Sequence, residues 1–193
     1  MRNHRERIDQ AAIGLEPLTQ GWRTEVTALA ADPFVRRFTR IPEPPPEGFA
    51  EDWIEGYVSA RRESGSREGF AALDASGSFL GLALAPHIDR GEREVELGYM
   101  VAEAARGRGA GSAILTALTA WAFEELAMQR AYLIIHVENL ASERVARRCG
   151  YVREGVMRSI LLKGDEQIDA GLWSRLPSDP PPPDPPPTPS RRQ

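Results

Sequence analysis

The segment Arg106-Gly107-Arg108-Gly109-Ala110-Gly111-Ser112 says more about the fold than any other part of the chain. Three glycines fall within five positions, so the backbone can adopt conformations that other residues avoid and can approach a ligand closely. A strand is predicted before the segment and a long helix after it. The unpaired N–H groups of that helix start carry about half a positive charge, and Arg106 and Arg108 add side-chain charge. The segment therefore predicts a main-chain site for a diphosphate.

Two better-known phosphate loops do not match this segment. A dinucleotide-binding loop needs G-x-G-x-x-G, but position 112 is serine. A Walker loop needs a lysine after its last glycine, and the segment contains no lysine. The structural alternative is that the glycines only tighten a turn between strand and helix.

Hydrophobic periodicity and turn residues on either side of this loop predict the order β-α-α-β-β-β-α-β-α-β-β. This order indicates an α/β (α+β) fold, a mixed sheet with helices on its faces. The predicted strands are 11–18, 69–73, 79–86, 92–101, 131–137, 151–162 and 167–176. The predicted helices are 20–31, 49–63, 109–127 and 142–149.

The chain divides into one domain and two polar ends. Residues 1–10 are nearly all polar and are predicted to be flexible. Residues 11–176 are predicted to form a single domain, large enough for its own core. Residues 177–193 contain nine of the sixteen prolines, so this tail can form neither helix nor ladder strand and is predicted to be disordered.

Composition limits which binding partners and which cellular compartment are expected. The formal net charge of −4 argues against nucleic acid, which favours a basic face. Cys149 is the single cysteine, so an internal disulfide is excluded and a reducing, cytoplasmic location is expected. No signal peptide is visible. The longest apolar run, residues 109–123, is too short to span a bilayer, so we expect no membrane partner.

The loop and its surroundings resemble the GNAT superfamily of acyl-CoA N-acyltransferases. Arg106, Gly109 and Gly111 match that family's [QR]-x-x-G-x-[GA] signature. The segment 137–151 (VENLASERVARRCGY) looks like the family's N-x-x-[AS] and G-[FY] region. Ser142 and the segment 152–156 look most like the RimJ/RimL branch, which includes acetyltransferases of ribosomal-protein N-termini.

The resemblance implies a mostly antiparallel sheet whose central strands, ending at Val101 and Val137, splay apart at a bulge, with helices on both faces. It also implies that acetyl-CoA is the cosubstrate and that its pantetheine arm pairs with the backbone of Met100 and Val101. The three histidines and one cysteine offer no metal cluster, so no metal is expected. The diphosphate-binding residues would be Arg106, Gly107, Arg108, Gly109, Ala110, Gly111 and Ser112. Asn139 would bind the pantetheine or the substrate; equally, it could cap the next helix.

Direct transfer to an amine requires a base, because a free amine is mostly protonated at neutral pH. Glu96 is the predicted base, since the superfamily often carries a basic glutamate on this strand, and Glu94 is the reserve. The alternative is that Glu96 is a structural or surface carboxylate. A backbone N–H near Met100 or Val101 could stabilise the oxyanion.

The acid that protonates the leaving thiolate is harder to assign. Many superfamily members place a tyrosine seven residues after the asparagine, where this chain has Ala146. Ser142 is the predicted substitute; the alternative is a helix-cap serine. The missing tyrosine also motivates a second hypothesis, a non-catalytic acyl-CoA-binding or partner-binding module.

The acceptor is not readable from the sequence. The resemblance allows a protein N-terminal α-amine or a small-molecule amine, and it leaves a homodimer possible. The substrate loops would lie in residues 19–68 and 157–167. Side chains that could line the entrance, or simply be solvated, are Arg36, Arg37, Glu55, Arg61 and Arg62.

Overall fold

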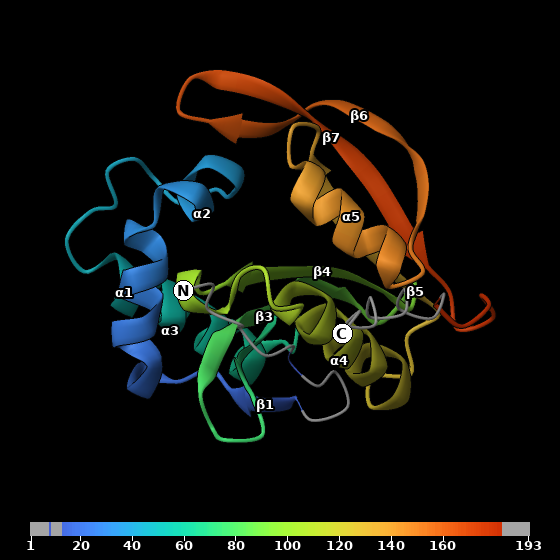
Figure 1. The fold of residues 1–193 in the computed structure, drawn as a ribbon, viewed down its shortest axis with the longest axis horizontal. Helices are drawn as coiled ribbons and strands as arrows, with labels where there is room; N and C mark the ends of the chain where they lie inside the picture. The colour runs from blue at the N-terminus through green and yellow to red at the C-terminus, as the bar shows by residue number, and fades with distance from the viewer. Residues whose placement is uncertain (1–7, 9–12, 183–193) are drawn as a thin grey trace, which may run out of the picture.

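The computed structural model describes Ile8 and residues 13–182, in which seven strands form one sheet in the order β1-β2-β3-β4-β5-β7-β6 (Figure 1). The strands are β1 (Gly14–Pro17), β2 (Glu68–Leu73), β3 (Phe79–Asp89), β4 (Glu94–Val101), β5 (Arg130–His136), β6 (Val152–Lys163) and β7 (Glu166–Arg175). The helices are α1 (Arg23–Ala31), α2 (Pro33–Phe38), α3 (Phe49–Glu63), α4 (Ala110–Glu124) and α5 (Leu140–Arg148), with short 3₁₀ turns η2 (Gln20–Trp22) and η3 (Glu103–Ala105).

The centre of the sheet is a fork. All neighbouring strands of the sheet are antiparallel except β4 and β5, which run parallel. These two strands pair only where Glu94–Glu96 face Arg130–Tyr132, and beyond that point they separate. The predicted fold class, a mostly antiparallel sheet with splayed central strands, is confirmed.

The predicted bulge lies elsewhere. The register shift nearest the fork is between β3 and β4, at Leu84 and His87, rather than between β4 and β5. Pro86 falls inside this shift, and a proline has no N–H to donate to a ladder, so a bulge is where the sheet tolerates it. The fork opens because β4 stays with β3 while β5 follows β7.

Helices cover both faces of the sheet, as predicted. On one face the buried Ile114, Leu115 and Leu118 of α4 pack in one core with Val95 and Leu97 of β4. On the other face, α1 and α3 bury Val26, Leu29 and Ile54 in a second core with Leu82 and Leu84 of β3. Side chains alternate across a strand, so β3 and β4 supply residues to both cores.

Helix α2 was not predicted. The sequence places a helix end before Asp32-Pro33, and α1 does end there, but a new helix starts at once. The Asp32 carboxylate accepts hydrogen bonds from the N–H groups of Phe34 (2.8 Å) and Val35 (3.3 Å), and Pro33 stands at the first helical position. Aspartate at the cap followed by proline is a helix-start signal that the prediction read only as a stop.

The closed end of the fork is held by one ionic cluster. Arg130 of β5 binds both carboxylate oxygens of Glu154 on β6 (2.6 and 2.7 Å) and lies 3.5 Å from Glu94 of β4. Ser174 of β7 donates to the same Glu154 at 2.5 Å. Four strands are therefore joined where the fork begins.

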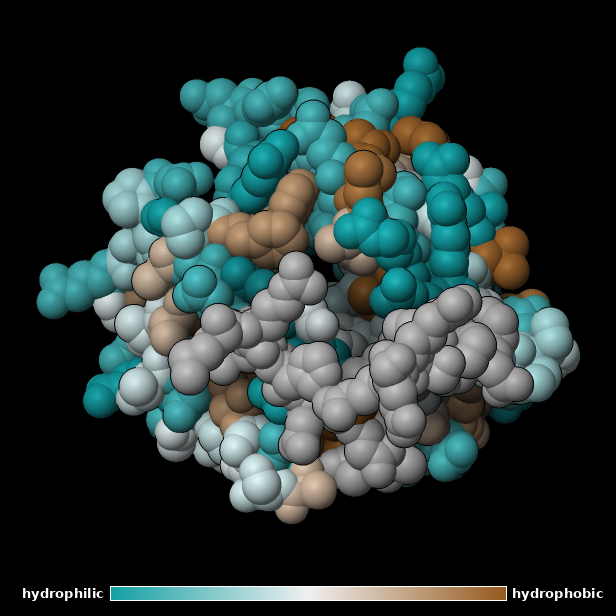
Figure 2. All heavy atoms as spheres, viewed as in Figure 1, coloured by the Kyte–Doolittle hydropathy of each residue, from teal (hydrophilic) through white to brown (hydrophobic). Residues whose placement is uncertain are grey.

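Residues 1–7, 9–12 and 183–193, at the two ends of the chain, lie outside the described residues. Ile8 is described: it is buried, and its N–H donates to the Arg108 carbonyl at 3.0 Å. Figure 2 shows one face of the molecule, mostly hydrophilic with scattered hydrophobic side chains. None of the described helices is both long and apolar enough to cross a membrane.

Candidate active site

A cleft of about 970 Å³ occupies the opening between β4 and β5. Every residue predicted from the sequence to bind cosubstrate or to act in catalysis lines this cleft. They are Glu96, Met100, Val101, Arg106, Gly107, Arg108, Gly109, Ala110, Gly111, Ser112, Asn139 and Ser142. The fold thus brings together residues that the sequence spreads over nearly fifty positions.

The glycine loop forms one end of the cleft. Gly107 and Gly109 have φ of +74° and +93°, in the left-handed region that favours glycine, and both are exposed. A Cβ added at either position would meet nothing within 4 Å, so the space above this main chain is open. The first α4 amide that donates back to the loop is that of Ala113, to Gly109 (3.0 Å). Helix geometry leaves the amides before it for a ligand, and a diphosphate fits this chemistry.

Arg106 is held by the protein itself. Its guanidinium pairs with the Asp32 carboxylate, donates twice to the Val101 carbonyl (3.2 and 3.0 Å), and lies 4.9 Å from the Phe34 ring. Burial acts to raise the pKa of Asp32, but hydrogen bonds from Arg106 and from the α2 amides outweigh it, so this pKa is lowered. Arg106 thereby fastens the loop to β4 and α2. Its predicted charge contribution to phosphate binding stays a prediction.

Main-chain groups of β4 divide between the two sides of the strand. The Met100 carbonyl faces β3, because a Cβ on Gly81 would lie only 2.0 Å from that oxygen. Neighbouring residues of a strand point their backbone groups to opposite sides, so Val101 turns its own toward the fork. Met100 therefore contributes its side chain to the cleft lining.

Glu96 stands where the fork opens. It is the last β4 residue that pairs with β5, and it is half-buried. Burial raises the pKa of its carboxyl, while the charges of Arg40, His87 and Arg67 act in the opposite direction. A carboxyl with a raised pKa is better matched to accept a proton near neutral pH. Glu94, the reserve candidate, pairs with Arg130 and is not among the cleft residues.

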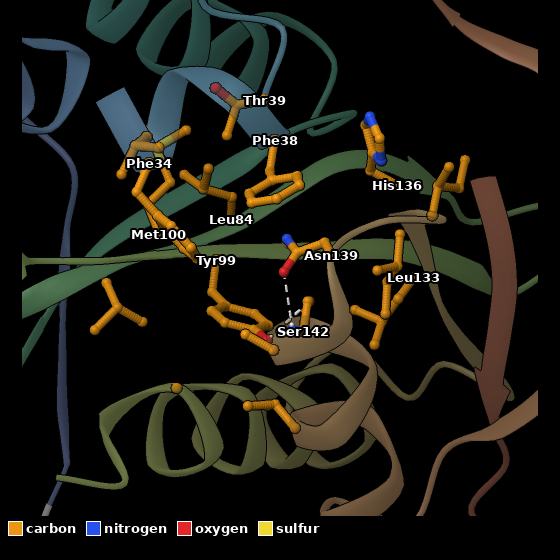
Figure 3. Close-up of a pocket in the computed structure, with 18 of the residues that line it drawn as sticks. Phe34, Phe38, Thr39, Leu84, Tyr99, Met100, Leu133, His136, Asn139 and Ser142 are labelled. Carbon is orange, nitrogen blue, oxygen red and sulfur yellow. Dashed lines mark hydrogen bonds between the residues drawn. The ribbon is translucent and has the colours of Figure 1, made fainter. Parts of the chain in front are cut away.

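Two hydroxyl groups meet on the other side of β4. The Tyr99 and Ser142 hydroxyls are 2.9 Å apart, and burial raises the pKa of Tyr99 (Figure 3). The Ser142 N–H donates to the Asn139 side chain at 3.1 Å, so Asn139 caps α5, the structural role that the sequence left open. Ser142 itself lies within α5, and its hydroxyl forms its hydrogen bond with Tyr99.

Tyr99 was missed by the sequence prediction. Alternation along β4 places it on the α4 side with Val95 and Leu97, where an apolar residue is expected. Only the spatial proximity of α5 shows that its hydroxyl has a partner in the cleft. Glu96 lies on the opposite face, so a proton acceptor and a hydroxyl pair flank the fork from two sides.

The acetyltransferase (GNAT) domain family matches residues 13–152 of the chain. The chain belongs to the GNAT acetyltransferase family. The predicted family is thereby confirmed, and relatives of the RimL kind are among its matches.

Sequence and structural relatives agree with this membership. The chain is 33% identical over 112 residues to YdaF of Bacillus subtilis (strain 168), provisionally named a ribosomal N-acetyltransferase, and the match spans 58% of each chain. RimL, a ribosomal L7/L12 α-N-protein acetyltransferase, superposes with a TM-score of 0.77 at 18% identity, over 86% of this chain and 90% of RimL. Spermidine N-acetyltransferase from Vibrio cholerae, in complex with CoA and spermine, gives 0.76 at 20% identity, over 88% and 98%. The two structures show a shared fold.

The other end of the GNAT cleft is closed by segments remote in sequence. Figure 1 shows the β6–β7 hairpin reaching toward α2. At its tip, the Lys163 ammonium donates to the carbonyls of Arg36 (2.5 Å), Thr39 (3.2 Å) and Ile41 (2.9 Å). A cation is well placed at the carboxyl end of a helix, where carbonyls lack partners. This contact joins the hairpin to the end of α2 and covers this end of the cleft.

Aromatic side chains line this end of the GNAT cleft. They include Phe38, Phe49, Trp53 and Tyr57. His136 closes the edge: its ring lies 5.4 Å from the Phe38 ring, and its Nδ1 accepts from the Glu138 N–H at 3.0 Å (Figure 3). Of the five side chains considered for the entrance, only Arg37 lines the cleft, and Arg40 and Arg67 were missed.

Cys149 and Tyr151 lie in the core of this GNAT domain. Cys149 is buried, and its Sγ lies 3.5 Å from the Ser112 carbonyl and 3.6 Å from the Thr116 hydroxyl. Burial raises the pKa of this thiol, so it is not a ready nucleophile. Tyr151 is also buried, with its hydroxyl 2.7 Å from that of Thr119.

Proposed function

We propose that the chain is an N-acetyltransferase that moves an acetyl group from acetyl-CoA directly to a primary amine. The observation that carries the proposal is the fork, with an open main-chain cradle at one end and a half-buried carboxyl, Glu96, at its base. Family membership supports the same chemistry. The acceptor would be a protein N-terminal α-amine or a small-molecule amine.

The donor half would be built mainly from backbone. Amides of residues 107–112 would bind the diphosphate, and the pantetheine arm would run between β4 and β5 along Val101. Beyond Glu96 the edge of β4 has no β5 partner, which supports this path. The Val101 carbonyl is already bound by Arg106, so Val101 would offer its N–H. Asn139 uses its side-chain oxygen to cap α5, which leaves its NH₂ group for the pantetheine.

The transfer itself needs three proton movements: one from the ammonium, a second from the attacking nitrogen, and one to the leaving thiolate. Glu96, acting through water, would take a proton from the ammonium form of the acceptor, and the neutral amine would attack the thioester carbonyl. The C–N bond forms and the C–S bond breaks, with the oxyanion held by a main-chain N–H near Val101. The leaving thiolate would receive a proton from the Ser142 hydroxyl, supported by Tyr99, and the second proton lost by the attacking nitrogen would restore this hydroxyl pair. The raised pKa of Tyr99 keeps its hydroxyl protonated, so Tyr99 can donate a hydrogen bond to Ser142.

Tyr99 bears on the second hypothesis, a non-catalytic acyl-CoA-binding module. That hypothesis rests on Ala146 standing where relatives carry a tyrosine. Ala146 is fully buried in the α5 contact with the core and offers no hydroxyl. We infer that the phenol of Tyr99, which reaches Ser142 from β4, supplies the missing group.

The test is release of coenzyme A from acetyl-CoA with a panel of peptide N-termini, lysine peptides, polyamines, amino acids and amino-sugars. Steady release that depends on an amine, with the acetylated amine identified by mass spectrometry, supports the enzyme. Tight acetyl-CoA binding without turnover on any amine supports the binding module.

We also propose a homodimer and a cytoplasmic location. Strand β6 is an edge of the sheet, and it exposes Val152, Val156 and Leu162, with 60%, 46% and 56% of their surface accessible. Such an edge is a ready surface for a second copy. Light scattering after size-exclusion chromatography tests the dimer, and cell fractionation tests the location.

A further inference from the structure

The cleft is strongly cationic although the chain is acidic overall. Among the described residues that line it, eight carry a cationic side chain and one, Glu96, carries a carboxylate. The whole chain has a formal net charge of −4. Cations are therefore concentrated in the cleft, and a concave, low-dielectric site focuses such a field.

Half of these cations belong to the donor end. Arg106 and Arg108 precede α4, and Arg144 and Arg148 lie on α5 beside it. Four cations suit the phosphates of coenzyme A. The remaining four, Arg37, Arg40, Arg67 and Lys163, lie outside the glycine loop and α5, and we assign them to the acceptor end.

Two of the acceptor-end cations already have protein partners. Arg37 pairs with Glu138 at 3.1 Å, and Lys163 donates to three carbonyls. Arg40 and Arg67 are exposed, and neither has a carboxylate within 4.0 Å among the described residues. Both line the same cleft as Glu96 and Tyr57, and both act electrostatically on these two groups.

We propose that the acceptor is a primary amine that carries an anionic group, and that Arg40 and Arg67 bind this group while Glu96 receives the amine. The proposal rests on the proposed function and names its substrate class. Guanidinium groups are suited to carboxylate or phosphate because they present a fork of donors. Two aromatic side chains that line the same cleft, Trp53 and Tyr57, favour an acceptor with an apolar body. Amino acids and acidic peptide N-termini both have this chemistry.

A polyamine does not suit this end of the cleft. Its several ammonium groups would face four cations and one carboxylate. Like charges brought together without solvent between them are unfavourable, which gives discrimination against such a substrate. Spermidine is therefore expected to be a poor acceptor here, although a relative of the same fold acts on it.

The experiment compares acceptors that differ only in the anion. The peptides Ala-Asp-Phe-amide and Ala-Asn-Phe-amide share the same N-terminal residue. Phenylalanine and phenylalaninamide form the amino-acid pair, and their rates are compared per neutral amine, because the α-carboxylate makes the amine of phenylalanine more basic. We expect kcat/KM to be higher for the acidic member of at least one pair, by about tenfold or more. A preference within the peptide pair would assign the anion to an acidic side chain, and a preference within the amino-acid pair would assign it to the α-carboxylate.

The variants are Arg40→Gln, Arg67→Gln and their combination, with Arg62→Gln as the control. Arg62 is exposed on α3 and is not among the cleft residues. In the double variant the preference for the acidic acceptor should fall to near one, while KM for acetyl-CoA stays within about twofold. Arg62→Gln should leave both unchanged.

Two results would overturn the proposal. Equal kcat/KM for acidic and neutral members of both pairs would do so, as would faster acetylation of spermidine. If the variants instead slowed both members equally and moved the acid limb of the pH profile, the arginines would only tune Glu96. Equilibrium binding of the same peptides to the CoA-loaded protein gives the comparison without turnover. A lack of transfer would therefore contradict the proposed function alone, and a lack of any acidic preference in binding would contradict this proposal.

Discussion

Helices α3 and α4 begin in the same way and leave opposite charges at their starts. Each has 15 residues, and each follows a glycine in the left-handed conformation: Gly48 (φ 76°, ψ 1°) before α3 and Gly109 (φ 93°, ψ 0°) before α4. Helix α3 carries Glu51 and Asp52 in its first turn. Helix α4 has no acidic residue there and no side-chain cap.

The difference favours the start of α4, rather than that of α3, as the proposed anion site. Each acidic side chain in a first turn offsets the positive helix end by about 0.3–1 kcal/mol. Helix α3 is therefore satisfied by its own residues, and it serves the cleft through the side chains of Phe49, Trp53 and Tyr57. Helix α4 keeps its positive end for a bound anion. In the proposed function, the donor would be recognised mainly by backbone and the acceptor by side chains.

The largest expected effect is a loss of kcat without a loss of acetyl-CoA affinity, because Glu96 serves the acceptor and not the donor. Glu96→Gln should lower kcat by about 10²–10⁴-fold, the usual contribution of a positioned base. Acetyl-CoA affinity should be unchanged. The base works as a carboxylate, and its pKa is raised by burial. Activity of the unmodified enzyme should therefore be lost as the pH falls through a value above 4.5, the ordinary glutamate value.

Glu94→Gln is the matched control for that prediction, since Glu94 lies two positions earlier on the same face of β4 and is outside the cleft. It should retain near-normal kcat. A Glu96→Gln enzyme with full activity would remove the glutamate from the mechanism.

The second prediction concerns a variant in which the start of α4 carries an acidic side chain, as the start of α3 does. Gly109→Glu puts a carboxylate beside the amides of the loop, so acetyl-CoA affinity should fall by about 100-fold or more in a calorimetric titration. Gly48→Glu, at the other left-handed helix start, imposes the same backbone cost and should leave the affinity unchanged. Equal losses in both variants would point to misfolding rather than to the phosphate site.

The third prediction concerns the hydroxyl pair on the α4 side of the fork. Tyr99→Phe removes the partner of Ser142, so kcat should fall by about tenfold, the value of one hydrogen bond. Tyr151→Phe removes a comparable hydroxyl pair in the core, with Thr119. That variant should lose stability and keep its kcat. The opposite pattern would exclude Tyr99 from thiolate protonation.

The smallest prediction tests the charge at the start of α3. Asp52→Asn should lower the free energy of unfolding by about 0.3–1 kcal/mol, because one charge at the positive helix end is lost. Salt screens such interactions, so the difference should shrink in 1 M NaCl, where the Debye length is about 3 Å. Urea unfolding at both salt concentrations measures it. A difference that does not change with salt would assign the loss to something other than the helix charge.

Features made by consecutive residues were predicted well from the sequence. The glycine loop of residues 106–112 and helix α3 (Phe49–Glu63) are examples, because turn glycines and helical spacing are local signals. The strand order along the chain was also correct, apart from small shifts at the ends. Helix α2 was missed although its signal is local, because Asp32-Pro33 can both end one helix and begin the next.

Features made by residues far apart were not predictable in the same way. Tyr99 and Ser142 meet across 43 positions, and Lys163 reaches Arg36 across 127. Arg40 and Arg67 carry no motif, and the role proposed for them arises only because the fold brings both into one cleft with Glu96. Burial of Glu96 at the opening of the fork is likewise a property of the folded sheet.

The most direct measurement is a comparison of amide chemical shifts in ¹⁵N-labelled protein titrated with coenzyme A and, separately, with pantetheine, which lacks the diphosphate. If main chain at the start of α4 binds the diphosphate, coenzyme A should shift the amides of Gly107, Gly109 and Gly111 strongly, and pantetheine should leave them nearly unchanged. The start of α3 should respond to neither. Coenzyme A that binds and leaves the three glycine amides unshifted would contradict the account.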